Sequence, residues 1–173
     1  MTTTTPAAPP VWRFVVPIAL TSANDHVVNG RDVVARARYK ARRNTAALAV
    51  GIAARNAGVP LLDRAPYVDR GGVIVTPRPV RAVRVVRLLA PRMRMWDDDN
   101  LVAACKALRD ACQLPRLWRG RWIPGAAIVV DDSATWSAWT YAQERAADGV
   151  AAVRIEVSEP TTAGPVSARS DEP

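Results

Sequence analysis

The pattern of apolar and polar positions divides the chain into short strands and two helical stretches. Residues 11–20 form an apolar, β-branched run that ends in turn-forming residues, which predicts a strand. Residues 33–56 contain no proline and are followed by Gly58 and Pro60, which predicts one long helix. Residues 80–90 are again β-branched and predict a second strand, although an arginine at every third position weakens the alternation.

The second half of the domain continues this pattern. Residues 101–112 predict a helix, because six apolar residues fall on one face at helical spacing: Leu101, Ala104, Cys105, Leu108, Ala111 and Cys112. Residues 126–130 predict a short strand, and residues 136–144 and 150–157 predict a hairpin closed at Asp148 and Gly149. The expected fold is therefore α+β, with a mixed or antiparallel sheet packed against two main helices.

The two ends of the chain differ from the middle in composition. Residues 1–10 and 159–173 are rich in Thr, Pro, Ala and Ser and have few large apolar side chains, so we expect disordered tails. Residues 11–158 then form one domain, for which the chain length is sufficient. Cys105 and Cys112 lie in an apolar segment and fit reduced core thiols better than a disulfide or a zinc site.

The charge balance favours a polyanionic partner. The chain has 24 Lys and Arg against 16 Asp and Glu, a net charge of +8, so nucleic acid is the first expectation and an acidic membrane surface the second. High-GC coding would also enrich Arg, Ala, Val and Pro without any such function. No apolar run approaches the roughly 18 residues of a membrane helix, and the N-terminus lacks a basic segment. We therefore expect a cytoplasmic protein without a membrane partner.

An acidic run, Asp97 to Asp99 followed by Asn100, is the main candidate for chemistry. In an extended segment side chains alternate, so Asp97 and Asp99 would point to the same side and Asp98 away. Mg²⁺ prefers oxygen ligands and often takes one or two carboxylates together with a substrate phosphate. Asp132, which follows the next predicted strand, is the expected third ligand, and the cluster predicts dependence on a divalent metal.

A structural role for the same run is the alternative. Asp and Asn cap helices by accepting hydrogen bonds from free backbone N–H groups, so this run could simply begin the helix that follows. An EF-hand is excluded, because a loop starting at Asp97 would have Val102 and Leu108 where Gly and Glu are required. His26 is the only histidine, which excludes a His-based triad and a multi-His zinc site.

Three blocks of sequence stand out in this part of the chain: Asp97-Asp98-Asp99-Asn100-Leu101, Lys106-Ala107-Leu108-Arg109-Asp110-Ala111 and Asp131-Asp132-Ser133. Together they resemble the RusA family of Holliday-junction resolvases. In the family these correspond to Asp-x-Asp-Asn-Leu, Lys-x-x-x-Asp-Ala and a downstream Asp-Asp. Ser22-Ala23-Asn24 resembles the family's Ser-Asn turn, and the resemblance spans roughly residues 12–157. The spacing from Asn100 to Lys106 is about one helical turn longer here, and Trp96 replaces a basic residue.

The resemblance implies a homodimeric endonuclease that uses Mg²⁺, with Mn²⁺ as a substitute, and cuts four-way DNA junctions by paired nicks. It implies that Asp97, Asp99 and Asp132 bind the metal and that Lys106 is a catalytic lysine. We expect the nicked DNA to carry 5′-phosphate ends and the enzyme to act in DNA recombination and repair. Asp131, Asn100 and Asp110 would orient these residues without binding the metal directly.

Further basic residues are candidates for contacts with DNA. The predicted long helix and the residues just before it carry the densest group, Arg31, Arg36, Arg38, Lys40, Arg42 and Arg43, and Arg92 and Arg94 precede the acidic run. Arg119 and Arg121 alternate with tryptophans in a segment that is longer than its counterpart in the family. The alternatives are a solvated helix face for the first group, and tryptophans that pack on the sheet or on a second subunit for the last.

Two other functions remain open. The chain could be a catalytically silent DNA-binding protein that assists recombination, or a small basic structural protein whose acidic run is only a cap. Cleavage of a synthetic four-way junction with and without Mg²⁺ distinguishes these possibilities.

Overall fold

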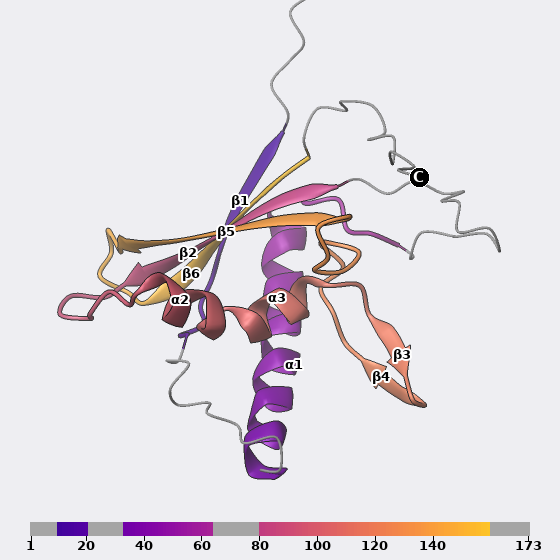
Figure 1. The fold of residues 1–173 in the computed structure, drawn as a ribbon. Coiled ribbons are helices and arrows are strands. Elements are labelled where there is room, and N and C mark those ends of the chain that lie inside the picture. Colours follow the sequence, from indigo (N-terminus) through magenta and orange to yellow (C-terminus); the bar gives the residue numbers. More distant parts are fainter. Residues whose placement is uncertain (1–9, 21–32, 64–79, 160–173) are drawn as a thin grey trace, which may run out of the picture.

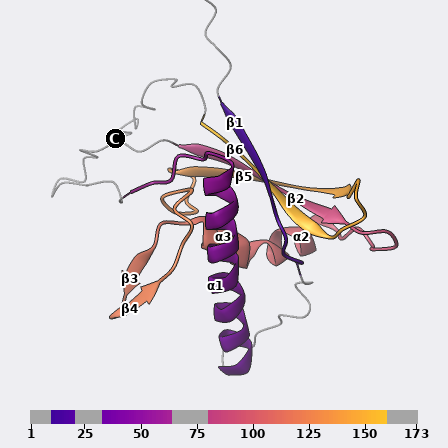
Figure 2. The same ribbon diagram turned by 180° about the vertical axis from the view of Figure 1, so that it is seen from behind.

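The computed structural model describes residues 10–20, 33–63 and 80–159. These residues form a four-stranded mixed sheet, a separate two-stranded ribbon and three helices, an α+β fold as the sequence predicts. The helices lie on one side of the large sheet, and the ribbon extends away from it (Figures 1 and 2). The predicted tails, except for residues 10 and 159, and the turn at residues 21–24 lie outside the described residues.

The large sheet has the strand order β1-β6-β2-β5. Its strands are β1 Val11–Val16, β2 Arg81–Leu89, β5 Ser137–Arg145 and β6 Ala152–Ser158. β2 pairs in parallel with β5 and antiparallel with β6, while β1 pairs antiparallel with β6. β1 is shorter than predicted and stops before Pro17, which has no N–H for a ladder. The predicted hairpin is wrong in its pairing, because β2 lies between β5 and β6.

Helix α1, Val33–Asn56, has the predicted bounds. Only its second half faces the core, where Ala46, Ala47, Val50 and Ala54 are buried. The helix ends before Gly58, whose φ of +72° is easy only for glycine and whose N–H donates to the Arg55 carbonyl. The first half of α1 extends beyond the sheet (Figure 1), and its basic residues are exposed except for the half-buried Arg43.

The predicted helix 101–112 is in fact two short helices. α2 spans Asp98–Ala104 and α3 spans Lys106–Cys112, with a break at Cys105. The Cys105 N–H still donates to Leu101 and its carbonyl accepts from Arg109, so the chain bends without losing these bonds. The predicted apolar face is confirmed, since all six of its residues are buried. Both cysteines are free and buried, as expected for core thiols.

The predicted strand at residues 126–130 does not form a ladder. Its residues are apolar and mostly buried, but their N–H groups donate to the last carbonyls of α3: Ala126 to Ala111, and Ile128 and Val129 to Cys112. Such carbonyls have no partner within their own helix. The segment therefore satisfies the C-terminal end of α3, with only an isolated bridge between Gln113 and Val129.

The two-stranded ribbon was not predicted. β3, Arg116–Trp118, and β4, Arg121–Ile123, pair antiparallel across the two residues Arg119 and Gly120. Both turn residues have positive φ, 48° and 72°, as a tight hairpin of the I′ type requires. Gly120 between two short Arg/Trp segments is the signal that could have revealed this hairpin.

The faces of the large sheet differ in chemistry. The face toward the helices is apolar and includes Val83, Val85 and Ile155, which are at most 1% exposed. The opposite face carries a network of ion pairs, in which Arg154 contacts Glu144 at 2.8 Å and Glu156 at 3.0 Å. One face therefore supplies the core and the other a solvated surface.

Candidate functional site

Asp97 lies at the start of α2 and caps it. Its Oδ1 accepts from the Asn100 backbone N–H and its Oδ2 from the Asn100 side-chain amide, both at 2.8 Å. These two bonds favour the charged carboxylate and lower the pKa of Asp97. The capping role that the sequence allows is thus confirmed for Asp97, and Asn100 is its partner.

Asp98 and Asp99 belong to the first turn of α2, not to an extended segment. The expected alternation, with Asp97 and Asp99 on one side and Asp98 on the other, is therefore wrong, because helical neighbours are separated by about 100°. Both side chains are exposed, and neither forms a hydrogen bond or ion pair with another described residue. Two accessible carboxylates thus stand at the positive end of a short helix.

The residue before this cap is held firmly on the sheet. Gln143 of β5 accepts from the Trp96 N–H at 3.0 Å and donates to the Trp96 carbonyl at 2.8 Å. The same Gln143 Oε1 accepts from Arg87 at 2.8 Å, and the Arg87 guanidinium lies 3.3 Å from the centre of the Trp96 ring. Sequence reasoning missed this group, which we call the Gln143 clasp (Arg87, Trp96, Gln143). It fixes the direction in which the chain enters α2.

Lys106 begins α3 and is mostly exposed. Its ammonium lies 3.9 Å from Asp110, one turn later, a distance at the limit of an ion pair. Asp110 also accepts a hydrogen bond from the Tyr39 hydroxyl of α1. Burial, followed by this bond to Asp110, raises the pKa of Tyr39. Asp110 therefore links α3 to α1 and orients the helix that carries Lys106.

Asp132 contacts α3 through Arg109. Its Oδ2 lies 3.1 Å from the Nε of Arg109, and both side chains are partly buried. Burial raises the pKa of the nearby Tyr141 hydroxyl, while Arg109 acts in the opposite sense. Asp131 instead accepts from the Ser133 N–H at 2.8 Å and stabilises its own turn. The Lys106–Ala111 and Asp131–Ser133 blocks are thus joined by Arg109 and Asp132.

The predicted three-carboxylate metal site is not assembled in the described residues. No group of three or more His, Cys, Asp or Glu side chains there is placed to hold a metal ion. Both Asp97 oxygens accept bonds from Asn100, and Asp132 faces Arg109. The accessible donors are Asp98 and Asp99, which match the one or two carboxylates that Mg²⁺ usually takes along with phosphate oxygens. We therefore assign no reaction step to a metal ion.

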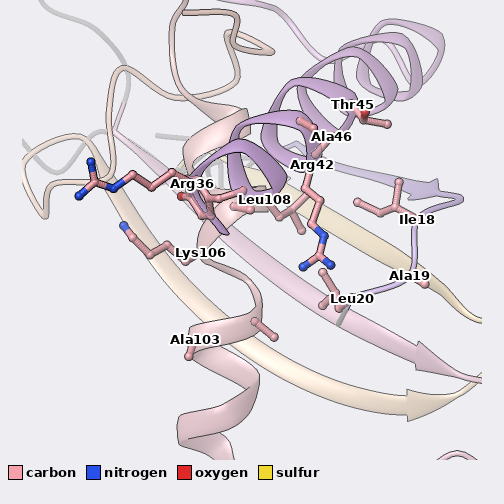
Figure 3. Close-up of a pocket in the computed structure, with 14 residues that line it drawn as sticks. Ile18, Ala19, Leu20, Arg36, Arg42, Thr45, Ala46, Ala103, Lys106 and Leu108 are labelled. Carbon is pink, nitrogen blue, oxygen red and sulfur yellow. The ribbon is translucent and has the colours of Figure 1, made fainter. Parts of the chain in front are cut away.

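The basic half of α1 and Lys106 border one groove. This groove, of about 810 Å³, lies between α1, the α2–α3 junction and residues 18–20, and its lining is mainly apolar. The charged ends of Arg36 and Lys106 point to the same side of it, while Arg42 points toward Leu20 (Figure 3). The predicted DNA-binding helix and the predicted catalytic lysine thus share one surface.

The other predicted contacts with DNA lie in three places. Arg38 and Lys40 are exposed on α1, Arg43 is half-buried there, and Arg31 lies outside the described residues. Arg92 and Arg94 are exposed in the loop between β2 and α2, and Arg119 and Arg121 are exposed on the β3–β4 ribbon. Trp118 and Trp122 are also exposed, so packing on the sheet is excluded for them.

Comparisons with protein-family models and with curated proteins gave no match for this chain. Within the described part of the chain, no helix has both the length and the apolar character needed to cross a membrane.

Proposed function

We propose that this chain is a structure-specific DNA endonuclease that resolves four-way junctions by paired nicks, as the resemblance to the RusA family implies. The observation that carries the proposal is the 3.1 Å contact between Arg109 and Asp132. It joins the second and third blocks of the resemblance in space, and the first block begins the helix that leads into the second. Residues 109 and 132 are thus in contact although they are far apart in sequence, which supports the proposal by bringing the third block beside the second.

Each residue of this unit has a role that its surroundings support. Asp97 positions the start of α2 through its bonds to Asn100, which leaves Asp99 in solvent where a substrate can reach it. Among the described residues, Lys106 has only a distant partner in Asp110, so its ammonium is available to neutralise charge on a scissile phosphate. Arg109 holds Asp132 beside α3. Asp131 and Asp110 act by positioning.

The electrostatics suit a DNA substrate. The exposed cations of α1 (Arg36, Arg38 and Lys40) bind phosphates without sequence choice, and Arg36 borders the same groove as Lys106. When bound, Mg²⁺ or Mn²⁺ would be held by Asp99 together with phosphate oxygens of the substrate and would supply charge neutralisation and an activated water. A homodimer would provide the two active sites that paired nicks require. The product ends would carry 5′-phosphates, suited to recombination and repair.

The test is cleavage of a synthetic four-way junction, compared with a linear duplex of the same sequence, with Mg²⁺ and with a chelator. Cleavage of the junction alone, dependent on Mg²⁺ and symmetric on two opposing strands, supports the proposal. Junction binding without cleavage in Mg²⁺ or Mn²⁺ refutes it and supports the alternative of a catalytically silent DNA-binding protein. The unassembled carboxylates of the metal site are the observation that favours this alternative.

A further inference from the structure

The β3–β4 ribbon and the middle of α1 enclose a second cleft, of about 490 Å³. This volume lies within the range of pockets that hold small ligands. We call it the ribbon cleft, and it is lined by Lys40, Arg43, Trp118, Arg119, Arg121, Trp122 and Ile123. The ribbon projects beside α1 in both ribbon views (Figures 1 and 2). No residue of the acidic run lines this cleft, so it is separate from the site described above.

The tryptophans of the ribbon are unusually exposed. Trp118 is 58% exposed and Trp122 is 65% exposed, although large aromatic side chains usually bury most of their area. Strand pairing places Trp118 opposite Arg121 and Trp122 opposite Leu117, so the two indoles are on opposite faces of the ribbon, and both residues border the cleft. The fold thus uses neither indole for its core, which points to a ligand with flat apolar surfaces.

The charge of the ribbon cleft has one sign. Four of its seven lining residues are cationic and none is acidic. Lys40, Arg119 and Arg121 form no ion pair with another described residue, and the buried Arg43 Nε has no hydrogen-bond partner among them. Cations gathered without counter-charges attract a polyanion. The ligand must therefore combine several negative charges with flat apolar groups.

The turn of the ribbon supports the same conclusion. Arg119 occupies the first central position with φ of +48°, where Asn, Asp or Gly is favoured and a residue like arginine costs about 1 kcal/mol. In this conformation the Arg119 guanidinium lies 5.5 Å from the centre of the Trp118 ring. A cation beside an exposed indole offers a phosphate contact next to a stacking surface. Strained residues of this kind are concentrated at functional sites, which is consistent with a binding role for the ribbon.

We propose that the ribbon cleft binds single-stranded nucleic acid, with phosphates on Lys40, Arg43, Arg119 and Arg121 and unpaired bases stacked on Trp118 and Trp122. Duplex DNA offers the same phosphates, but its bases are stacked on one another and cannot use the indoles. An acidic protein segment would match the charge without requiring two exposed tryptophans. Binding in the ribbon cleft does not require that the carboxylates of α2 cut DNA.

The experiment measures binding of the full chain to fluorescein-labelled oligo-dT and oligo-U by anisotropy, in a chelator so that no strand is cut. Trp118→Ala and Trp122→Ala should each weaken binding about tenfold or more. The control is Leu117→Ala, which removes an equally exposed apolar side chain from the same ribbon but no aromatic face, and should leave the affinity within about twofold. Circular dichroism of each variant checks that the fold is intact.

Two further arms separate stacking from charge. An abasic oligonucleotide of equal length keeps the phosphates but can stack on neither tryptophan, so the wild type should bind it more weakly than Trp118→Ala or Trp122→Ala binds oligo-dT. Arg121→Ala should reduce the slope of the logarithm of the binding constant against the logarithm of the salt concentration by about 0.7, which corresponds to the loss of one phosphate contact. Arg55→Ala, on α1 beyond the cleft, should leave this slope unchanged. Binding of neither oligonucleotide, or tryptophan variants that bind as the wild type does, would overturn the proposal. So would a stronger preference for polyglutamate.

Discussion

Removing the side chain of Gln143 tests whether the Gln143 clasp holds the start of α2 in place. Gln143→Ala deletes three hydrogen bonds, two with the Trp96 backbone and one with Arg87. Each neutral bond contributes about 1 kcal/mol and the bond to a charged group about 1.5–3 kcal/mol. Because Arg87 is only 3% exposed, water cannot fully replace its lost partner. We expect the free energy of unfolding to fall by about 3.5–5 kcal/mol.

Urea denaturation followed by circular dichroism measures this loss as a lower midpoint at an unchanged m-value. Gln143→Glu keeps the acceptor for Arg87 and loses only the amide donor, so it should cost about 1 kcal/mol. Thr140→Ala, at an exposed position of the same strand, should stay within about 0.5 kcal/mol of the wild type. A loss for Gln143→Ala no larger than that for Gln143→Glu would refute the reasoning.

Three other substitutions test separate parts of the fold. Tyr39→Phe removes the hydrogen bond to Asp110 and should cost about 1 kcal/mol in urea denaturation at neutral pH. The pKa of Tyr39 is raised in the folded state, so the contribution of Tyr39 to stability is complete below its unfolded pKa, about 10, and is lost as pH rises further. The difference in free energy of unfolding between the wild type and Tyr39→Phe should therefore narrow above that pH. Gly125→Ala would place a Cβ 2.0 Å from the Gln113 carbonyl oxygen, so we expect a loss of several kcal/mol, measured as a lower thermal midpoint, and an unchanged midpoint would contradict this packing. Arg119→Asn relieves the positive φ and should raise stability by up to about 1 kcal/mol in the same measurement; a loss of stability would argue against the assigned turn.

Local signals account for the elements that the sequence predicts well. α1 has the predicted bounds because Gly58 and Pro60 stop a proline-free segment at that point. β2 is predicted from its β-branched residues. Its two buried arginines, Arg81 and Arg87, are compatible with the strand because partners distant in the chain offset the cost of burying them. Arg81, for example, donates to Glu159 and to the Ile128 carbonyl. Those partners could not be read from the sequence.

Pairing and helix ends depend on contacts between distant segments, which local patterns do not contain. The runs that become β5 and β6 resemble a hairpin, yet β2 separates them because it pairs with both. The apolar run at residues 126–130 reads equally well as a strand, and the open carbonyls of α3 decide otherwise. Length and apolar character alone do not distinguish these outcomes.

The same limit applies to the candidate site. The sequence around Asp97 allows either helix capping or metal binding. In the structure Asp97 caps α2, because Asn100, three residues later, donates to both of its carboxylate oxygens. The contact of Asp132 with Arg109 joins residues 23 positions apart, and no periodicity marks it. The Gln143 clasp combines three segments in the same way. The residues of the site were therefore predictable as candidates, but their partners were not.

We propose that the exposed carboxylate of Asp99 takes part in cutting four-way DNA junctions. The direct measurement is the single-turnover cleavage rate of a synthetic junction in Mg²⁺, for Asp99→Asn and for Asp148→Asn. Asp148 is also an exposed carboxylate, it lies in the turn between β5 and β6, and asparagine can keep its bond to the Val150 N–H. We predict that Asp99→Asn lowers the rate by roughly 10²-fold or more with junction affinity retained, while Asp148→Asn cuts as the wild type does. Equal rates for the two variants would contradict the claim.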